Sequence, residues 1–277
     1  MAWWQAVEDA FPGGRGRRSL WSALITLVIA VLITLVWLAG RYEASQLQAE
    51  LERDTADAVS DLRTQLSRHV QALQGLQSTL ASEAFWSVEA HALLRENRDL
   101  LRIEWRDKDL ILKNFVDSPL RAPVFERSPR ADTLNETLQS CLRARRSSSA
   151  AYSSSYFLPQ NDGQGFEVME LCLPNMQAGE LVGFTVVTYS LQELLNARLG
   201  NSFGRRNEVS FTEPDGTRLA IAGSQRRGLR VFTAQQLVDL PGNTLVLRMD
   251  GRRSQPDLIP NVLTALVTGM SIALVTV

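Results

Sequence analysis

Two long stretches without a charged residue bracket this chain and constrain its fold more than any other feature. The first runs from Ser19 to Gly40, between Arg18 and Arg41, and the second runs from Leu258 to Val277. Each has roughly the 20 residues that an α-helix needs to cross the hydrocarbon core of a bilayer. Roughly 200 residues separate them, which is enough for one or two folded domains. The sequence therefore predicts a folded domain between two transmembrane helices.

The charges around the first stretch predict its orientation. Three basic residues lie directly before it: Arg15, Arg17 and Arg18. Because such residues mark the cytoplasmic end of a first transmembrane helix, we expect residues 41–257 in the periplasm and the protein in a bacterial inner membrane. A cleaved signal peptide is the alternative, but its apolar region would be only about 7–15 residues long. Trp21 and Trp37, near the two ends of the stretch, favour an uncleaved anchor.

The second stretch reaches the last residue, Val277, without a polar or basic flank. A last transmembrane helix normally ends in such residues on the far side of the membrane. We therefore expect this helix to be truncated and an output module to follow Val277 in a longer protein. A short tail-anchored protein is the alternative.

Composition and motifs exclude several classes of function. The formal net charge is −1 with 21% charged residues, so the chain lacks the basic footprint of a nucleic-acid-binding protein. It contains no glycine-rich phosphate loop, no His-Glu-x-x-His motif and no Gly-x-Ser-x-Gly motif. We therefore expect that residues 1–277 are not an enzyme and need no cofactor.

The two cysteines, Cys141 and Cys172, both lie in the expected periplasmic domain. An even number of cysteines in an oxidising compartment suggests a disulfide, and closing a loop of this size is worth about 3–4 kcal/mol in the chain-entropy model. Two separate buried thiols are the alternative. A metal site is not expected, because His69 and His91 lie far from both cysteines in the sequence.

A long helix is expected directly after the first apolar stretch. Residues 43–95 contain no proline and only one glycine, Gly75. Apolar residues recur there at helical spacing: Leu47, Leu51, Ala58, Leu62, Leu66, Val70, Leu73, Leu76 and Leu80. This stripe could pack on the domain's own sheet, on a second protomer, or on both. Since long helices with such repeats often pair, we expect a homodimer.

Beyond Asn97 the pattern changes to that of strands. Five are expected first, over 100–106, 110–116, 151–158, 165–173 and 180–189. A short helix over 191–199 then leads to four shorter strands, over 208–212, 217–222, 229–232 and 244–249. Asp132 or Thr133 is expected to cap a further helix that runs to Arg146, because Glu136 follows near the third position of a capping box. One face of that helix carries Leu134, Leu138, Cys141 and Leu142.

In this order of elements the chain resembles the extracytoplasmic PAS-like sensor domains of bacterial receptors, the double Cache (PDC) class, to which CHASE domains are related. The stretch Leu101-Arg-Ile-Glu-Trp-Arg-Asp107 is similar to the first strand of the distal unit in proteobacterial sensor kinases. The resemblance covers about residues 19–277. It implies an α+β fold with a long N-terminal helix and two PAS-like mixed or antiparallel sheet units, flanked by two transmembrane helices.

This organisation divides the chain into six segments. We expect a cytoplasmic N-terminus over 1–18, transmembrane helices over 19–40 and 257–277, a long periplasmic helix over 41–96, a membrane-distal sensor unit over 97–200 and a smaller membrane-proximal sheet unit over 201–256.

The expected strands supply the candidate ligand-binding residues. Alternation along a strand would place Tyr152, Ser154 and Tyr156 on one face. Glu170 stands in an otherwise apolar strand and, since burying an unpaired charge is costly, it should be exposed or face a cation. In Cache sensors the pocket lies on the distal sheet. That resemblance implies the following site: Tyr152, Ser154, Tyr156, Glu170 and Thr185, with Arg121 and Arg143 as clamps for a ligand carboxylate. The alternative is that these are ordinary half-buried sheet residues.

The favoured function is the periplasmic ligand-sensing and transmembrane signalling portion of a two-component sensor histidine kinase. Its partner would be a small molecule, such as an organic acid or an amino acid, or a periplasmic binding protein. The sensor half of a chemoreceptor or of a diguanylate cyclase would have the same layout. A non-signalling, membrane-anchored oligomerisation scaffold is a third hypothesis.

Overall fold

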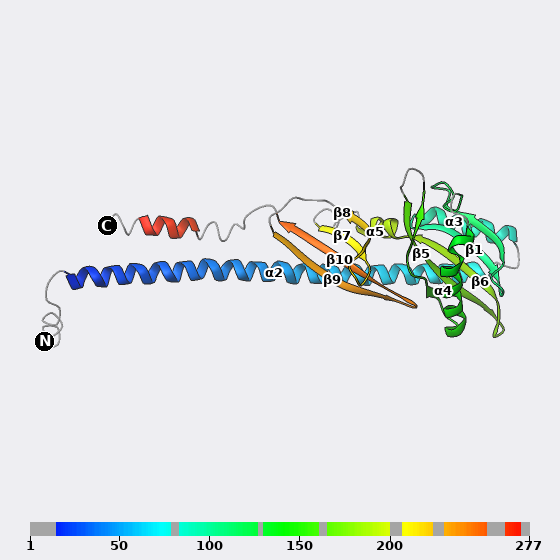
Figure 1. Cartoon of the computed structure of the whole chain (residues 1–277), viewed down its shortest axis with the longest axis horizontal. Coiled ribbons are helices and arrows are strands. Elements are labelled where there is room, and N and C mark those ends of the chain that lie inside the picture. Colours follow the sequence, from blue (N-terminus) through cyan, green and yellow to red (C-terminus); the bar gives the residue numbers. More distant parts are fainter. Residues whose placement is uncertain are drawn as a thin grey trace. The chain divides into compact units, whose positions relative to one another are not determined.

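A computed structural model of the chain describes residues 15–78, 83–126, 130–160, 165–199, 207–223, 230–253 and 264–272. Figure 1 shows the helices and strands along the chain. The chain divides into two compact units. One is Glu50–Arg252, which holds both sheets, and the other combines the flanking segments 1–49 and 253–277.

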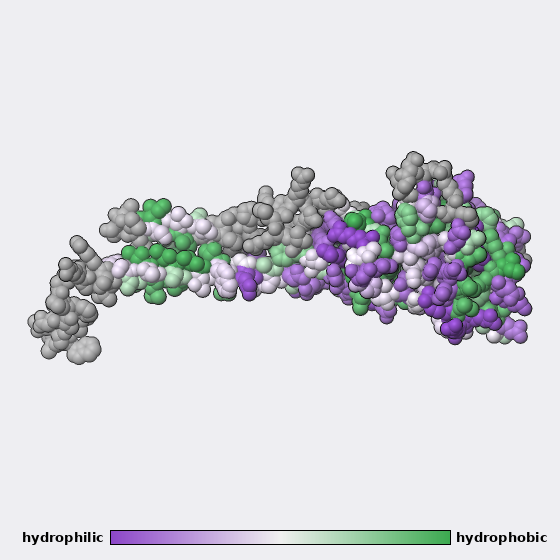
Figure 2. All heavy atoms as spheres, viewed as in Figure 1, coloured by the Kyte–Doolittle hydropathy of each residue, from purple (hydrophilic) through white to green (hydrophobic). Residues whose placement is uncertain are grey.

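The flanking unit contains the start of helix α2, which runs from Arg15 to Gln77. This is the one helix in the described ranges that is long and apolar enough to cross a membrane. Its first part exposes many large apolar side chains: Trp21, Leu24, Leu27, Val31, Ile33, Leu35, Trp37 and Leu38. Figure 2 shows apolar patches along this part of the helix, interrupted by paler residues. Residues 264–272 are also helical. The rest of the second predicted span lies outside the described residues, so that span stays a prediction.

The single helix predicted over 41–96 is wrong. Helix α2 ends at Gln77, and a separate helix, α3, spans Glu83–Glu96. At the end of α2 the backbone N–H and the hydroxyl of Ser78 both donate to the carbonyl oxygen of Gly75, at 3.1 and 2.6 Å. A serine that bonds back to the helix in this way competes with its continuation. Leu80, the last residue of the predicted stripe, lies outside the described residues.

The apolar stripe of α2 packs on the chain's own sheets. Its buried members share one core with both sheets and with α3: Leu51, Ala58, Leu62, Leu66, Leu73 and Leu76. Trp86 of α3 is fully buried in the same core. Each fully buried leucine stabilises the fold by roughly 1.5–3 kcal/mol. The sheets therefore account for this stripe, and the predicted homodimer would need another surface.

The larger sheet is antiparallel and contains six strands in the order β2-β1-β6-β5-β3, with β4 also paired to β5. The strands are β1 Leu100–Asp107, β2 Leu112–Asp117, β3 Ala151–Tyr152, β4 Tyr156–Pro159, β5 Gly165–Gln177 and β6 Glu180–Ser190. Helices α2 and α3 pack on one face of this sheet. Helix α4, Leu134–Ser147, packs on the other face, against β5 and β6.

The start and the buried face of α4 differ from the prediction. A short 3-10 helix, η1 Arg130–Thr133, precedes α4, and Thr133 makes no side-chain cap because its hydroxyl donates to the carbonyl of Arg130 instead. The residues that α4 buries are small or polar: Thr137, Ser140, Cys141 and Ala144. Leu134, Leu138 and Leu142 are 39–43% exposed. Cys141 and Ala144 pack against an apolar patch of the sheet that includes Phe184 and Val186. Thr137, one turn earlier, donates a hydrogen bond to the Glu170 carboxylate.

The smaller sheet has the order β8-β7-β10-β9 and follows helix α5, Leu191–Leu199. Its strands are β7 Asn207–Thr212, β8 Arg218–Gly223, β9 Arg230–Leu240 and β10 Asn243–Arg253. Strand β9 is longer than the predicted 229–232 and is paired with β10, which begins directly after the turn at Pro241 and Gly242. The fold class expected from the sequence, α+β with two sheet units behind a long helix, is confirmed.

The β9–β10 turn joins the smaller sheet to the larger one. Its Pro241 carbonyl accepts the N–H of Tyr152 in β3 at 2.7 Å. Arg143 of α4 donates to the carbonyl of the same tyrosine at 3.2 Å. Gly242 has φ +90°, and a Cβ at this position would lie 3.0 Å from the Tyr152 carbonyl oxygen. This turn therefore requires a glycine both for its backbone angle and for its close approach to β3.

Gly242→Ala is expected to lower the free energy of unfolding by about 2–3 kcal/mol, because it combines a left-handed backbone with a displaced inter-sheet hydrogen bond. Gly216→Ala is the matched control, since Gly216 has φ +91° but nothing within 4 Å of the added Cβ. The control should lose only the backbone contribution, about 1–2 kcal/mol. Urea unfolding of both variants measures the difference, and equal losses would show that the contact with Tyr152 contributes nothing.

Candidate functional site

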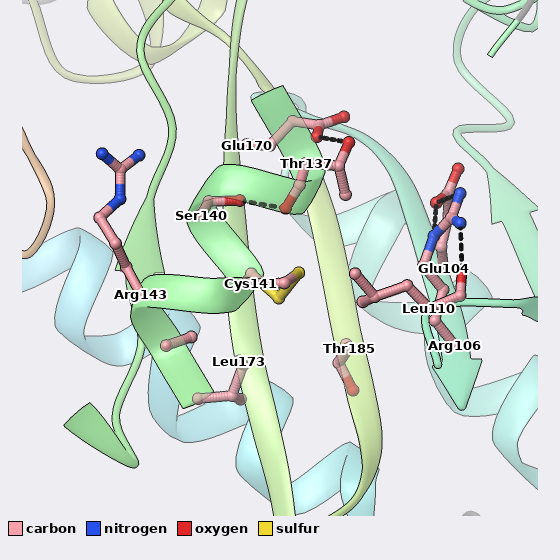
Figure 3. Close-up of a disulfide and its surroundings, with 12 residues drawn as sticks. Glu104, Arg106, Leu110, Thr137, Ser140, Cys141, Arg143, Glu170, Leu173 and Thr185 are labelled. Atoms are coloured by element: carbon pink, nitrogen blue, oxygen red, sulfur yellow. Dashed lines mark hydrogen bonds and ion pairs between the residues drawn. A yellow bond between two sulfur atoms is a disulfide. The ribbon is translucent and has the colours of Figure 1, made fainter. Parts of the chain in front are cut away.

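A cluster of buried charges lies on the face of the larger sheet that α4 covers. Alternation along β1 brings Arg102, Glu104 and Arg106 to this face, and β5 contributes Glu170. Figure 3 shows Glu104 with Arg106 on β1, and Glu170 beside Thr137 of α4. We call the set formed by Arg102, Glu104, Arg106, Asp117, Arg130 and Glu170 the buried ion cluster.

Glu104 lies at the centre of the buried ion cluster and is fully buried. Its carboxylate contacts the guanidinium groups of Arg102 at 2.8 Å, Arg106 at 2.7 Å and Arg130 at 3.0 Å. Burial alone would raise the pKa of this carboxyl, but the three nearby positive charges outweigh it and hold the pKa below its ordinary value. Glu104 is therefore an ionised carboxylate at neutral pH.

Arg130 links the two buried glutamates. Its guanidinium contacts Glu104 at 3.0 Å and Glu170 at 2.5 Å. Burial would lower the pKa of Arg130, but the two carboxylates more than offset this and raise it. Because the arginine stems from η1, immediately before α4, it also fixes the start of the helix that covers the cluster.

The sequence predicted that Glu170 is either exposed or faces a cation. In the structure it is buried and faces the guanidinium group of Arg130. Besides Arg130, its carboxylate accepts hydrogen bonds from the hydroxyls of Thr137 at 2.5 Å, Tyr156 at 2.9 Å and Thr188 at 3.3 Å. Burial, followed by the charge of Glu170, raises the pKa of Tyr156 and keeps its phenol protonated as a donor. Both oxygens of this buried carboxylate are thus occupied.

The cluster is balanced in charge, with three arginines and three carboxylates. Asp117 of β2 completes it through Arg102, at 3.2 Å, and burial raises the pKa of Asp117 in spite of that partner. Two aromatic rings cover the guanidinium groups: Phe115 lies 3.8 Å from Arg102, and Phe125 lies 4.5 Å from Arg130. Such stacking suits the flat, weakly hydrated guanidinium group. The result is a buried, charge-balanced cluster in which an added lone charge would have no partner.

Of the predicted site residues, the structure brings Tyr156 and Glu170 together. Tyr152 and Tyr156 were expected on one face, and this is wrong, because the predicted strand is interrupted between β3 and β4. Within the interruption Ser153 exchanges hydrogen bonds with the backbone of Glu170, at 2.8 and 2.9 Å. Tyr152 consequently faces α2 and packs against Tyr189, with ring centroids 6.5 Å apart.

Thr185 also lies on the face opposite Glu170. It pairs with Leu173 in the register of β5 and β6, and its hydroxyl accepts a hydrogen bond from Gln77 of α2 at 3.2 Å. Ser154 is exposed in the interruption between β3 and β4. The two predicted clamps have other partners, since Arg121 pairs with Glu193 of α5 and Arg143 bonds to the Tyr152 carbonyl. The structure therefore gathers two of the seven candidates into one site.

The residues that sequence reasoning missed are the arginines and their central glutamate. The stretch Leu101–Asp107 did carry a signal, because alternation along a strand places Arg102, Glu104 and Arg106 on one face. No comparable signal marks Arg130, which follows Pro129 in an irregular stretch.

A disulfide holds α4 against β5, next to Glu170 of the buried ion cluster. It joins Cys141 of α4 to Cys172 of β5, and both residues are fully buried (Figure 3). Cys172 lies on the same face of β5 as Glu170, two residues further along. The covalent link therefore holds the helix that supplies Thr137 against the strand that supplies Glu170.

Comparison with known proteins identifies the fold. No family model and no curated protein matches the chain. Among solved structures, the ligand-binding domain of the Pseudomonas aeruginosa PAO1 amino acid chemoreceptor PctB, in complex with L-Arg, matches with a TM-score of 0.51 and 14% identity, over 76% of this chain and 96% of that chain. The sensory domain of the Campylobacter jejuni chemoreceptor Tlp3 (CcmL), with isoleucine bound, matches with a TM-score of 0.50 and 12% identity, over 77% and 95%. The chain has the fold of these chemoreceptor sensory domains.

Proposed function

We propose that residues 50–252 form the periplasmic ligand-sensing domain of a transmembrane bacterial receptor. The observation that supports this most is the shared fold with chemoreceptor sensory domains, combined with a buried ion cluster on the sheet face against which α4 packs. A chemoreceptor accounts for the likeness at least as well as the sensor histidine kinase favoured from the sequence, because both compared structures come from chemoreceptors. Under this proposal the chain itself catalyses no reaction, and its two apolar stretches cross the membrane.

The proposed ligand is a small zwitterion of the amino-acid class. The two compared domains are complexed with L-Arg and isoleucine. In this chain a ligand carboxylate would replace a glutamate as a partner of Arg130, and a ligand ammonium would bind the released carboxylate of Glu170 beside the Tyr156 oxygen. Such an exchange keeps every buried charge paired, which addition of a singly charged ligand would not.

The proposed signal starts at Arg130, which contacts both buried glutamates. Because this arginine links Glu104 and Glu170 directly before α4, its displacement by a ligand would change how η1 and α4 rest on the sheet. The β9–β10 turn contacts both α4 and β3, so a shift of α4 reaches the smaller sheet through Arg143 and Tyr152. A ligand can shift this equilibrium only by its difference in affinity for the two arrangements.

The proposal is tested by thermal unfolding of the full chain in detergent micelles against single L-amino acids and organic acids. A ligand at about 100 times its Kd should stabilise the domain by about 2.7 kcal/mol. Glu170→Gln should abolish the response to an amino acid, because the amide cannot balance the ligand ammonium. Asp215→Asn is the control, since this carboxylate lies in the exposed β7–β8 turn. An absence of response to every compound, or an equal response in Glu170→Gln, would overturn the proposal and favour the scaffold hypothesis.

A further inference from the structure

A cavity lies on the other side of the larger sheet from the buried ion cluster. It has a volume of about 440 Å³ and is lined by α2, by the end of α3 and its connection to β1, and by α5. This volume falls within the range of about 300–1,000 Å³ that is typical of small-molecule pockets. His69, in its floor, stacks on Tyr189, which faces α2 and not α4. The two places are therefore separate.

Three arginines line this cavity from different elements: Arg68 of α2, Arg95 of α3 and Arg98 of the connection before β1. All three are exposed. Among the residues that the structure describes, none of the three has an ion pair or a side-chain hydrogen bond. This contrasts with Arg102, Arg106 and Arg130, whose guanidinium groups are all occupied by carboxylates.

The floor of the cavity is polar and already internally paired. Asp99 is 2% exposed, and its carboxylate accepts a hydrogen bond from Gln65 at 3.2 Å and lies 3.7 Å from His69. The other ring nitrogen of His69 lies 3.1 Å from the amide oxygen of Asn97. Glu96 is the one other acidic residue in the lining. The lining therefore contains three arginines but only two carboxylates, and one of these, Asp99, already contacts Gln65 and His69. This leaves an excess of positive charge in the cavity.

We propose that this cavity is a second ligand site, specific for a small anion with several carboxylate or phosphate oxygens, which Arg68, Arg95 and Arg98 bind together. Guanidinium groups recognise both anions through paired N–H donors, so the two chemistries share one site. A bound anion would bridge α2, α3 and the start of β1, which already contact each other through the apolar core and through the Gln65–Asp99 and His69–Asn97 contacts. The site is independent of the amino-acid site proposed above.

The test measures binding of citrate, succinate and inorganic phosphate to the full chain in detergent micelles by isothermal titration calorimetry. We expect saturable binding of at least one anion with Kd below about 1 mM in 150 mM chloride. The double variant Arg68→Gln, Arg98→Gln should weaken it at least tenfold, and these exposed positions should leave folding intact. Arg53→Gln, an exposed α2 residue outside the cavity lining, controls for charge alone and should bind as the wild type does.

The outcomes separate the alternatives. Binding of citrate and succinate alone assigns a carboxylate ligand, and binding of phosphate alone assigns a phosphate ligand. No saturable binding of any of the three overturns the proposal, as does an equal loss in Arg53→Gln, which would show a non-specific charge effect. Glu170→Gln should leave anion binding unchanged, so failure of the amino-acid site and failure of this site are distinguishable.

Discussion

Glu104→Ala is expected to lower the free energy of unfolding by about 3–5 kcal/mol, the cost of breaking a buried ion pair from one side. The reason is that three arginines would lose their shared partner inside a buried site. Arg102 and Arg106 are only 6% and 4% exposed, so water cannot replace the carboxylate. Urea unfolding of the full chain, followed by circular dichroism, measures the loss.

The control for Glu104 is an exposed ion pair in the same sheet region. Lys113 contacts Asp107 at 3.0 Å, and the lysine side chain is 48% exposed. Lys113→Ala should therefore cost no more than about 1 kcal/mol. A loss of the same small size in Glu104→Ala would mean that the buried ion cluster contributes little to stability. Packing of the surrounding strands and helices would then keep its charged side chains in place.

Glu104 also determines how the stability of the fold changes as the pH falls. Its folded-state pKa lies below the ordinary value of 4.5, so its contribution to stability is fully present above that value and is lost as the pH falls through the folded pKa. Asp117 acts in the opposite direction, because its pKa is raised above 3.8 and its ionisation costs stability as the pH rises through the folded value. Glu104→Gln should flatten the loss of stability below pH 4.5, measured by urea unfolding at successive pH values. An unchanged acid profile would contradict this assignment.

The sequence predicts the elements well where one local pattern decides them. The strands over 165–173 and 180–189 and the helix over 191–199 appear as β5, β6 and α5, because alternation and turn residues are properties of neighbouring positions. The end of α2 could not be predicted in this way, since Ser78 and Gly75 close it through a few hydrogen bonds that no apolar period records.

The candidate site was only partly predictable, because strand register and irregular segments decide it. Glu170 was recognisable, since a charge within an apolar strand requires a partner. That partner, Arg130, stands after a proline in a stretch without periodicity. Thr185 was misplaced because its face depends on how β5 pairs with β6, which the separate strands do not reveal. The buried face of α4 was not predictable for a related reason, since it depends on contacts with β5 that are distant in the sequence: the Cys141–Cys172 disulfide and the Thr137–Glu170 hydrogen bond.

Replacing both Cys141 and Cys172 with alanine is expected to lower the free energy of unfolding by about 3–4 kcal/mol. The disulfide joins residues separated by 31 positions, and its loss increases the conformational entropy of the unfolded chain. Both sulfur atoms are buried, so two small cavities add to the cost. Urea unfolding of the oxidised wild type and of the double variant measures the difference.

The control is Thr137→Val, which removes the hydroxyl that α4 donates to Glu170 but keeps the disulfide. It should cost about 1.5–3 kcal/mol, the usual contribution of a hydrogen bond to a charged group. If the double cysteine variant loses less than Thr137→Val, polar contacts with the buried ion cluster hold α4 in place and the disulfide is secondary. If it loses more, the covalent link is what keeps α4 on the sheet, and the variant should also respond more weakly to an amino acid because η1 and Arg130 lose their fixed position.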